Sequence, residues 1–423
     1  MNESKKTAKI ILPTSLKFTY GEVCDFDRFL GLFDWSLKNS LVEIDFRYCR
    51  RANYQALSLV VLYIWFLKKN GCEIAFLYGD KTGQSATTMW YKMNAERLFD
   101  VLNDTGENFG NSIDEPLIPI RNSADFRRGL EIAENYTKEF DIEYEKTLRY
   151  VVSELLYNTL EHGSNSFAVP SLLNFKWYRD KGELSFVIAD LGIGIKRHLS
   201  QSYPELESNV AAIKLALKPQ VSGTFGNGNN PYGVKNNAGV GLYISSNIIR
   251  KLHADMYIIS GDGMVHVSPT EVTQKTLHNF WNGSFVYVTL KFGKIKNLNL
   301  QKMMSEFRES AIAEISKADS KEQQQSFYLS IKNYFGRYAE DKSLAIRIRD
   351  EKLLFAISEG KTLTIDFEDI ISAPHSLLNA LLATPIQRLS MAAYKKIKVI
   401  NASPEIRETI DFILDENTSS TSN

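Results

Sequence analysis

The first hundred residues alternate between short apolar segments with strand character and one longer apolar run. LVEIDF (41–46) and CEIAFLYG (72–79) are rich in β-branched and aromatic residues, which is typical of buried strands. Between them, ALSLVVLYIWFL (56–67) is apolar throughout but shorter than the roughly 20 residues that cross a bilayer. We therefore predict a buried helix there, no membrane span, and an α/β domain over residues 1–110.

The central part of the chain changes to a helical pattern followed by hairpin patterns. Apolar residues recur with helical spacing within 124–162. SLLNFKWY (171–178) and ELSFVIAD (183–190) are apolar segments joined by a short turn, which predicts a β-hairpin. The polar stretch 103–116 marks a boundary, so a second domain is predicted over 120–295.

The last hundred residues return to strands that alternate with helices. KTLTIDF (361–367) is a predicted strand, a helix follows at about 375–390, and the domain is expected to cover 300–416 before a disordered tail at 417–423. The predicted strand ends in the same Asp-Phe pair as VEIDF (42–46). Either chance or two related flanking domains explains this echo. The expected fold class is α/β, with an α+β sandwich at the centre.

Composition and charge narrow the classes of function. Lys and Arg number 50, as do Asp and Glu, so the 423-residue chain has a formal net charge of zero. This balance offers no long-range attraction for a polyanion, which argues against nucleic acid as a partner. The three cysteines Cys24, Cys49 and Cys72 have no CxxC spacing and suit a reducing compartment. The start of the chain lacks the apolar core of a signal peptide, so we expect a cytoplasmic protein.

A polar stripe lies on the predicted helix VVSELLYNTLEHG (151–163). Glu154 and Asn158 are four residues apart and share one helix face, which His162 continues one turn later. A carboxamide oxygen suits Mg²⁺, and a carboxylate can take a proton from an attacking water. Taken alone, a solvated helix face is the simpler interpretation of this stripe.

A predicted strand ends at Asp190 in the motif IADLGIGI (188–195). A buried carboxylate is a hydrogen-bond acceptor, so it can bind the exocyclic amine of adenine. Gly192 and Gly194 allow a sharp turn and the close approach of a flat ring. The pattern D-x-G-x-G is weak evidence by itself, because turns after strands often have this composition.

A third motif, NNAGVGLYI (236–244), places Gly239 and Gly241 at the start of a predicted helix. The unpaired amides and the dipole of a helix N-terminus favour phosphate there. Other nucleotide and metal motifs fit worse. The chain has no G-x-x-x-x-G-K-[ST] loop, no G-x-G-x-x-G after a strand, and no HExxH.

The order of these motifs over about 122–293 closely resembles the GHKL superfamily, the Bergerat-fold ATPases of gyrase, heat-shock chaperones, histidine kinases and mismatch-repair proteins. A helical E-x-x-x-N-x-x-x-H is followed by a strand ending in D-x-G-x-G, a long flexible segment, and G-x-G opening a helix. NGSFVYVTL (282–290) is similar to the last box of the family, with Ser284 where threonine is usual. The resemblance implies a central Bergerat ATP-binding fold.

The resemblance also implies a role for each motif residue. Glu154 would be the general base, Asn158 the Mg²⁺ ligand and Asp190 the adenine acceptor, while 195–237 would form the ATP lid. The other residues implied to bind the nucleotide are His162, Gly192, Gly194, Gly226, Gly228, Gly239, Val240, Gly241, Leu242 and Ser284.

The branch of the GHKL superfamily and the regions on either side of the central domain add further expectations. SELLYNTLEHG looks most like the histidine-kinase and anti-sigma-factor kinase branch, but no histidine precedes His162, so ordinary autophosphorylation is not expected. Residues 9–105 are similar to a STAS domain. Residues 305–415 resemble the STAS-like domain of unknown function that often accompanies bacterial GHKL proteins, with Ser372 and Ser376 at its loop-to-helix junction.

The leading hypothesis is a cytosolic ATPase that uses Mg²⁺ and ATP to switch its flanking STAS-like domains, which would bind a protein partner. One alternative is an anti-sigma-type protein serine/threonine kinase. Another is a non-catalytic, nucleotide-gated interaction protein. A homodimer is expected from the family resemblance alone.

Overall fold

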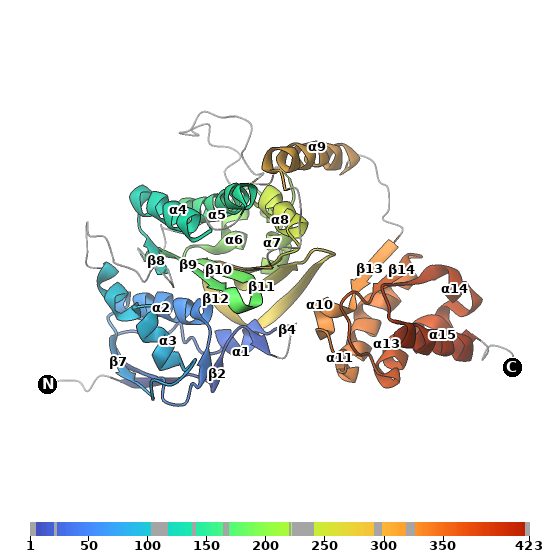
Figure 1. Cartoon of the computed structure of the whole chain (residues 1–423), viewed down its shortest axis with the longest axis horizontal. Coiled ribbons are helices and arrows are strands. Elements are labelled where there is room, and N and C mark those ends of the chain that lie inside the picture. Colours follow the sequence, from blue (N-terminus) through green and yellow to red (C-terminus); the bar gives the residue numbers. More distant parts are fainter. Residues whose placement is uncertain are drawn as a thin grey trace. The chain divides into compact units, whose positions relative to one another are not determined.

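The computed structural model describes residues 6–20, 23–102, 117–137, 141–163, 169–219, 221, 241–291, 298–318 and 326–418. They belong to two compact units, one made of residues 1–18 and 25–316 and the other of 19–24 and 317–423. Both units combine helices with β-sheet, so the predicted α/β class is confirmed (Figure 1). Within the described ranges, no helix has the length and apolarity that a membrane span requires.

The first unit begins with a parallel sheet of strand order β1-β5-β7. Its strands are β1 (Thr7–Ile11), β5 (Leu41–Asp45) and β7 (Glu73–Leu77). Parallel neighbours need a crossover, and α2 (Tyr54–Lys69) connects β5 to β7. The smaller elements of this region are β2 (Ser15–Leu16), β6 (Arg51–Ala52), α1 (Phe26–Leu30), α3 (Ala86–Lys92) and the 3-10 helix η1 (Ala95–Leu102).

Helix α2 confirms the predicted buried helix and explains why its sequence is apolar all round. The Asn53 side chain accepts a hydrogen bond from the amide of Ala56 and caps the helix, while Tyr54 to Leu67 are buried. One side of α2 packs on β7 and η1, and the other side lies against β9 and β10 of the central sheet. A helix enclosed on both sides has no polar face to present. The predicted regions 1–110 and 120–295 therefore share one compact unit.

The central sheet is antiparallel, with strand order β11-β12-β10-β9-β8. Its strands are β8 (Leu117–Ile120), β9 (Ser171–Tyr178), β10 (Glu183–Asp190), β11 (Asp255–Val267) and β12 (Val272–Lys291). The predicted hairpin is confirmed as β9 and β10, joined by the 3-10 turn η2 (Arg179–Lys181). The apolar residues of this hairpin lie on both faces of the sheet, so both faces must be buried by packing against other elements.

Helices cover one face of the central sheet and the N-terminal region covers the other (Figure 1). The helices are α4 (Ser123–Thr137), α5 (Ile142–Gly163) and α8 (Gly241–Lys251), whose apolar residues form one core with the strands. On the opposite face, aromatic side chains of the two regions interlock. Phe26 lies 5.4 Å from Tyr257 and Phe33 lies 5.5 Å from Trp281, measured between ring centroids.

Two short helices follow β10, namely α6 (Gly194–Leu199) and α7 (Asn209–Ala216). The start of α7 packs on the irregular part of β11, where a Cβ at Gly263 would lie 2.8 Å from the backbone of Asn209. The side-chain Nδ2 of Asn209 also donates to Asp262 Oδ1 at 2.7 Å. Helix α7 and all of α6 after its first residue fall within the predicted lid 195–237. The beginning of that segment is therefore fixed to the sheet, and residues 222–240 lie outside the described ranges.

Helix α9 (Leu300–Ala318) ends the first unit. The second unit contains a parallel sheet of order β13-β14-β15, with strands β13 (Ser326–Ser330), β14 (Thr362–Asp366) and β15 (Ile397–Ile400). Its helices are α10 (Ile331–Phe335), α11 (Lys342–Ile348), α12 (Leu354–Ser358), α13 (His375–Leu389), α14 (Ala393–Lys396) and α15 (Pro404–Thr418). The hairpin of β3 (Thr19–Tyr20) and β4 (Val23–Cys24) also belongs to this unit.

The predicted strand and helix of the second unit are confirmed as β14 and α13. The predicted tail needs a correction, because α15 continues to Thr418 and buries Asn417 and Thr418. The Asn417 side chain donates to the carbonyl of Ile413 and accepts from Gln387, which holds these residues in the fold. Residues 419–423 lie outside the described ranges.

Candidate functional site

Asp190 closes strand β10 as a buried carboxylate, with a relative exposure of 4%. The Ser284 hydroxyl donates to its Oδ2 at 2.5 Å, and the Gly192 amide donates to its Oδ1 at 2.7 Å. Burial raises the pKa of Asp190 to about 6, while these two donors oppose that rise. No cation is paired with this carboxylate among the described residues, so its charge is balanced by neutral dipoles alone.

The backbone around Asp190 is packed too closely for side chains at two glycines. Gly283 has a φ of +113°, and a Cβ there would lie 2.4 Å from the Asp190 carbonyl oxygen. Gly194 has a φ of +74°, and a Cβ there would lie 3.0 Å from Ser260 Oγ. Ser260 joins the two turns, because its hydroxyl accepts from the Ile195 amide and donates to the Gly283 carbonyl.

Trp281 fixes the carbonyl group of Asp190 from the opposite face of the sheet. Its indole Nε1 donates to the Asp190 carbonyl oxygen at 2.9 Å, and the ring is fully buried. The ring also packs edge-on against Trp35 at 5.2 Å and Phe33 at 5.5 Å. The N-terminal aromatic cluster is therefore in direct contact with the residue that holds Asp190 in place.

Glu154 lies on α5 and faces the first residue of α8. A Cβ at Gly241 would lie 2.1 Å from Glu154 Oε2, so a larger residue there would displace the Glu154 carboxylate from its present position. Tyr150 lies one turn earlier on α5. Burial raises the pKa of Glu154, and the nearby Tyr150 phenol partly opposes that rise.

The structure thus brings together two pairs of predicted site residues, Asp190 with Ser284 and Glu154 with Gly241. Asn158 follows Glu154 by one turn on α5 and is half-buried. His162 belongs to the last turn of α5, and its side chain lies outside the description. Leu242 is half-buried on α8 and packs against the central core.

Four predicted nucleotide-binding residues lie outside the described residues, so the structure does not test them. They are Gly226, Gly228, Gly239 and Val240. The described part of the phosphate-binding motif is therefore Gly241 and Leu242 at the start of α8.

Three residues of this site have no counterpart in the sequence prediction: Trp281, Ser260 and Tyr150. Tyr150 precedes Glu154 by four residues, so extending the polar stripe of Glu154 and Asn158 back by one turn would have found it. The contacts of Trp281 and Ser260 join strands far apart in the chain, and no local pattern signals them.

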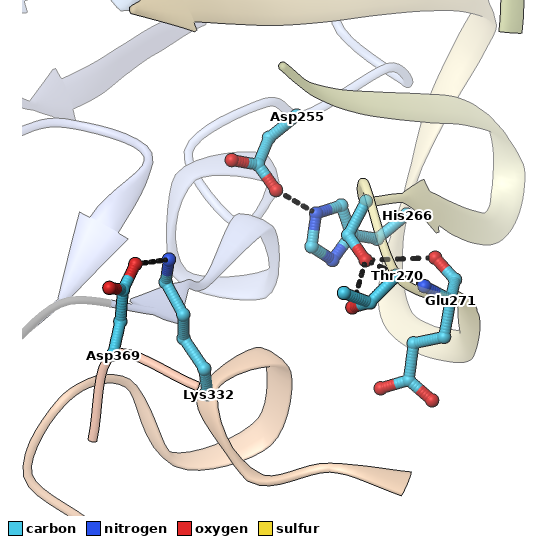
Figure 2. A network of polar contacts seen from close by, with 7 residues as sticks. Asp255, His266, Thr270, Glu271, Lys332 and Asp369 are labelled. Atoms are coloured by element: carbon cyan, nitrogen blue, oxygen red, sulfur yellow. Dashed lines mark hydrogen bonds and ion pairs between the residues drawn. The ribbon is translucent and has the colours of Figure 1, made fainter. Parts of the chain in front are cut away.

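A second polar network lies at the far end of the β11–β12 hairpin (Figure 2). The buried His266 ring pairs with Asp255 at 2.8 Å and stacks on Tyr257 at 4.1 Å. At the turn, the Ser268 hydroxyl accepts from the Glu271 amide and donates to its carbonyl. These bonds stabilise the turn between β11 and β12, so we assign the network a structural role. Figure 2 also shows the exposed ion pair of Lys332 and Asp369 in the second unit.

Comparison with known proteins identifies part of the second unit. Residues 345–407 match the model of the STAS-like domain of unknown function (DUF4325). This match confirms the predicted STAS-like character of the C-terminal region. The chain matches no curated protein and no solved structure. The assignment of the central sheet to the GHKL superfamily remains a prediction.

Proposed function

We propose that the first unit binds ATP in the manner of the GHKL superfamily and hydrolyses it with Glu154 as general base. One observation carries the proposal. Motif residues that are far apart in the chain converge in pairs, Asp190 with Ser284 and Glu154 with Gly241. A chance set of glycine-rich turns would not be expected to converge in this way.

The Asp190 carboxylate has the properties of an adenine acceptor. Its donors within the chain are the Ser284 hydroxyl and the backbone amides of Gly192 and Ser284, whereas a carboxylate offers about four acceptor sites, so capacity for a further hydrogen bond remains. An exocyclic amine can use that remaining capacity. Ionised Asp190 is also the better acceptor, so binding of the amine favours the charged form that burial disfavours.

The other end of the site fits a triphosphate and a metal ion. Gly241 lets the start of α8 approach Glu154, and the first amides of a helix are unpaired donors for phosphate. Asn158 offers a side-chain oxygen on the same helix as Glu154, and oxygen is the ligand that Mg²⁺ prefers. When bound, Mg²⁺ would neutralise phosphate charge.

Glu154 would take the proton of the attacking water at its carboxylate. Its raised pKa makes it a stronger base than an exposed glutamate. Glu154 Oε2 lies beside Gly241, the first residue of α8, and therefore beside the predicted phosphate site.

The test is ATP binding and turnover by the full chain, for the wild type and for Glu154→Gln. We expect turnover to fall by about 10²–10⁴-fold with ATP affinity retained, because the substitution removes the base and keeps its shape. Glu145→Gln, on the same helix, is the matched control and should leave turnover unchanged. A wild type that does not bind ATP would overturn the proposal, and unchanged turnover in Glu154→Gln would remove Glu154 from the mechanism.

The matched STAS-like domain supports one alternative, a protein kinase that acts on a STAS-like domain. Ser376 is exposed in the first turn of α13 within the matched residues. Labelled ATP separates the two functions. Label transferred to protein supports the kinase, and label released as free phosphate supports the ATPase.

A further inference from the structure

A bulge interrupts the pairing of strands β11 and β12. Along the ladder, Trp281 pairs with Gly261 and the next pair is Thr276 with Gly263. Residues 277–280, which we call the β12 bulge, therefore lie opposite one residue of β11. The additional residues of a bulge leave the ladder, so their backbone groups need partners outside it.

The N-terminal region supplies these partners. On α1, Asp27 Oδ1 accepts hydrogen bonds from the amides of His278, at 2.6 Å, and Asn279, at 3.1 Å. The Asn279 side chain donates in return to the Asp27 carbonyl oxygen at 3.0 Å. The Trp35 indole donates to the carbonyl oxygen of Phe280 at 3.2 Å. Burial acts to raise the pKa of Asp27, but its hydrogen bonds outweigh burial and lower that pKa, so the acceptor of the two amides is ionised at neutral pH.

The residues after the β12 bulge hold Asp190 by its main chain and by its side chain. The Trp281 indole donates to the Asp190 carbonyl oxygen at 2.9 Å, and the Ser284 hydroxyl donates to Oδ2 at 2.5 Å. Between these two residues, a Cβ at Gly283 would lie 2.4 Å from the same carbonyl oxygen. Residues 277–284 thus form one segment that is bound to the N-terminal region at its start and to Asp190 at its end.

We propose that Trp281 is a positioning residue for Asp190, and that Asp27 makes the N-terminal region part of the nucleotide site by holding the β12 bulge. The inference rests on the proposed function and deepens it, because it names what fixes the carboxylate that selects adenine. Release of the bulge would loosen Asp190. By thermodynamic linkage, a bound adenine base would stabilise the contacts of the bulge.

The selectivity between two bases measures how well Asp190 is positioned. Hypoxanthine, the base of inosine nucleotides, carries a carbonyl oxygen where adenine carries the exocyclic amine. It therefore presents an acceptor to the acceptor Asp190, and a correctly placed carboxylate disfavours it. Loss of position lowers the preference for adenine. Loss of stability alone lowers the folded fraction for both nucleotides and leaves the ratio of their Kd values unchanged.

The experiment is titration calorimetry of the full chain with ADP and with inosine diphosphate (IDP) at pH 8, where Asp190 is ionised. Neither nucleotide has a γ-phosphate to be hydrolysed. Trp281→Phe keeps an aromatic ring and removes the indole donor, so we expect the ratio of the Kd for IDP to the Kd for ADP to fall by about three- to tenfold. Asp27→Ala should lower the same ratio by less, because it acts through the β12 bulge.

Two further variants separate positioning from folding. Asp27→Asn keeps a side-chain oxygen that can accept both amides, so it should restore the ratio of the wild type. Asp34→Ala is the control and should not change the ratio, because it removes an exposed carboxylate of the same region that bonds to Ser36 in its own turn. If the wild type prefers ADP and both Trp281→Phe and Asp27→Ala keep that preference, the inference is wrong and the proposed function stands. If the wild type binds neither ADP nor ATP, the proposed function itself fails.

Discussion

Asp45 and Asp190 occupy the same kind of position, because each is the last residue of a strand in the first unit and each is buried. Their partners differ. Asp45 receives a bidentate contact from Arg47, at 3.0 and 2.7 Å, and an ion pair from Lys9 at 3.4 Å. Asp190 receives the Ser284 hydroxyl and the backbone amides of Gly192 and Ser284, none of which is charged.

The difference in partners has opposite electrostatic consequences. The hydrogen bonds from Arg47 hold the pKa of Asp45 well below its ordinary value, whereas burial raises the pKa of Asp190 to about 6. The first carboxylate is neutralised within the chain. The second is buried without a cation, which costs folding free energy and leaves capacity for a ligand. For a buried aspartate at the end of a strand, the hydrogen-bonding partners therefore indicate a ligand-binding role better than the degree of burial does.

Asp366 shows that the repeated Asp-Phe pair is architectural. It ends the middle strand of the second unit, as Asp45 does in the first parallel sheet, and both accept the amide of the residue two positions later. Its other donors are the Tyr328 phenol and the Asn401 side chain. The two sheets share strand order and an aspartate turn but use different partner chemistry.

The largest expected effect is on nucleotide affinity. Asp190→Asn replaces the acceptor by a side chain that carries a donor, so ATP affinity should fall by about 10–100-fold. Asp45→Asn is the matched control and should leave ATP affinity unchanged. Titration calorimetry on both variants measures the difference. Equal losses in the two variants would break the proposed distinction between the two carboxylates.

A second prediction concerns stability, for which Asp45→Asn should have the larger effect and Asp190→Asn the smaller. Asp45→Asn leaves Arg47 and Lys9 without their anion and should lower the free energy of unfolding of the first unit by about 1–3 kcal/mol. Asp190→Asn should cost less or stabilise, since it removes a buried charge that has no cationic partner. Urea denaturation at neutral pH compares the two. A larger loss in Asp190→Asn would contradict the electrostatic assignment.

The smallest expected effect is a pH dependence. ATP affinity should fall as the pH drops through about 6, by at most about tenfold per pH unit, because Asp190 becomes protonated. Asp45→Asn should keep this dependence and Asp190→Asn should lose it, while the titration of ATP itself is common to all three proteins. An identical profile in Asp190→Asn would assign the dependence to another group.

The same two groups contribute to stability with opposite signs. The raised pKa of Asp190 favours the folded state below its ordinary value of 3.8, and this contribution is lost as the pH rises through about 6. The lowered pKa of Asp45 favours the folded state above 3.8, and that contribution is lost as the pH falls toward its folded value. Unfolding measured across pH 3–7 in the two Asn variants separates these contributions.

Much of the fold was predictable because it rests on local patterns. The apolar run at 56–67, the hairpin of 171–178 and 183–190, and the helix near 375–390 all match described elements. The union of the N-terminal region with the central sheet was not predictable. It depends on the second side of α2 and on pairs such as Phe26 with Tyr257, which meet only in the folded chain.

The sequence by itself determined the candidate site residues, since Glu154, Asp190 and Gly241 belong to short motifs with fixed spacing. It also placed Arg47 two residues after Asp45. Only the tertiary structure decided how these groups are tuned. Trp281 reaches the carbonyl of Asp190 across 91 positions, and Ser284 reaches its carboxylate from another strand. The physical reason is that a pKa depends on excluded water and on neighbours in space, which the order of residues along the chain does not specify.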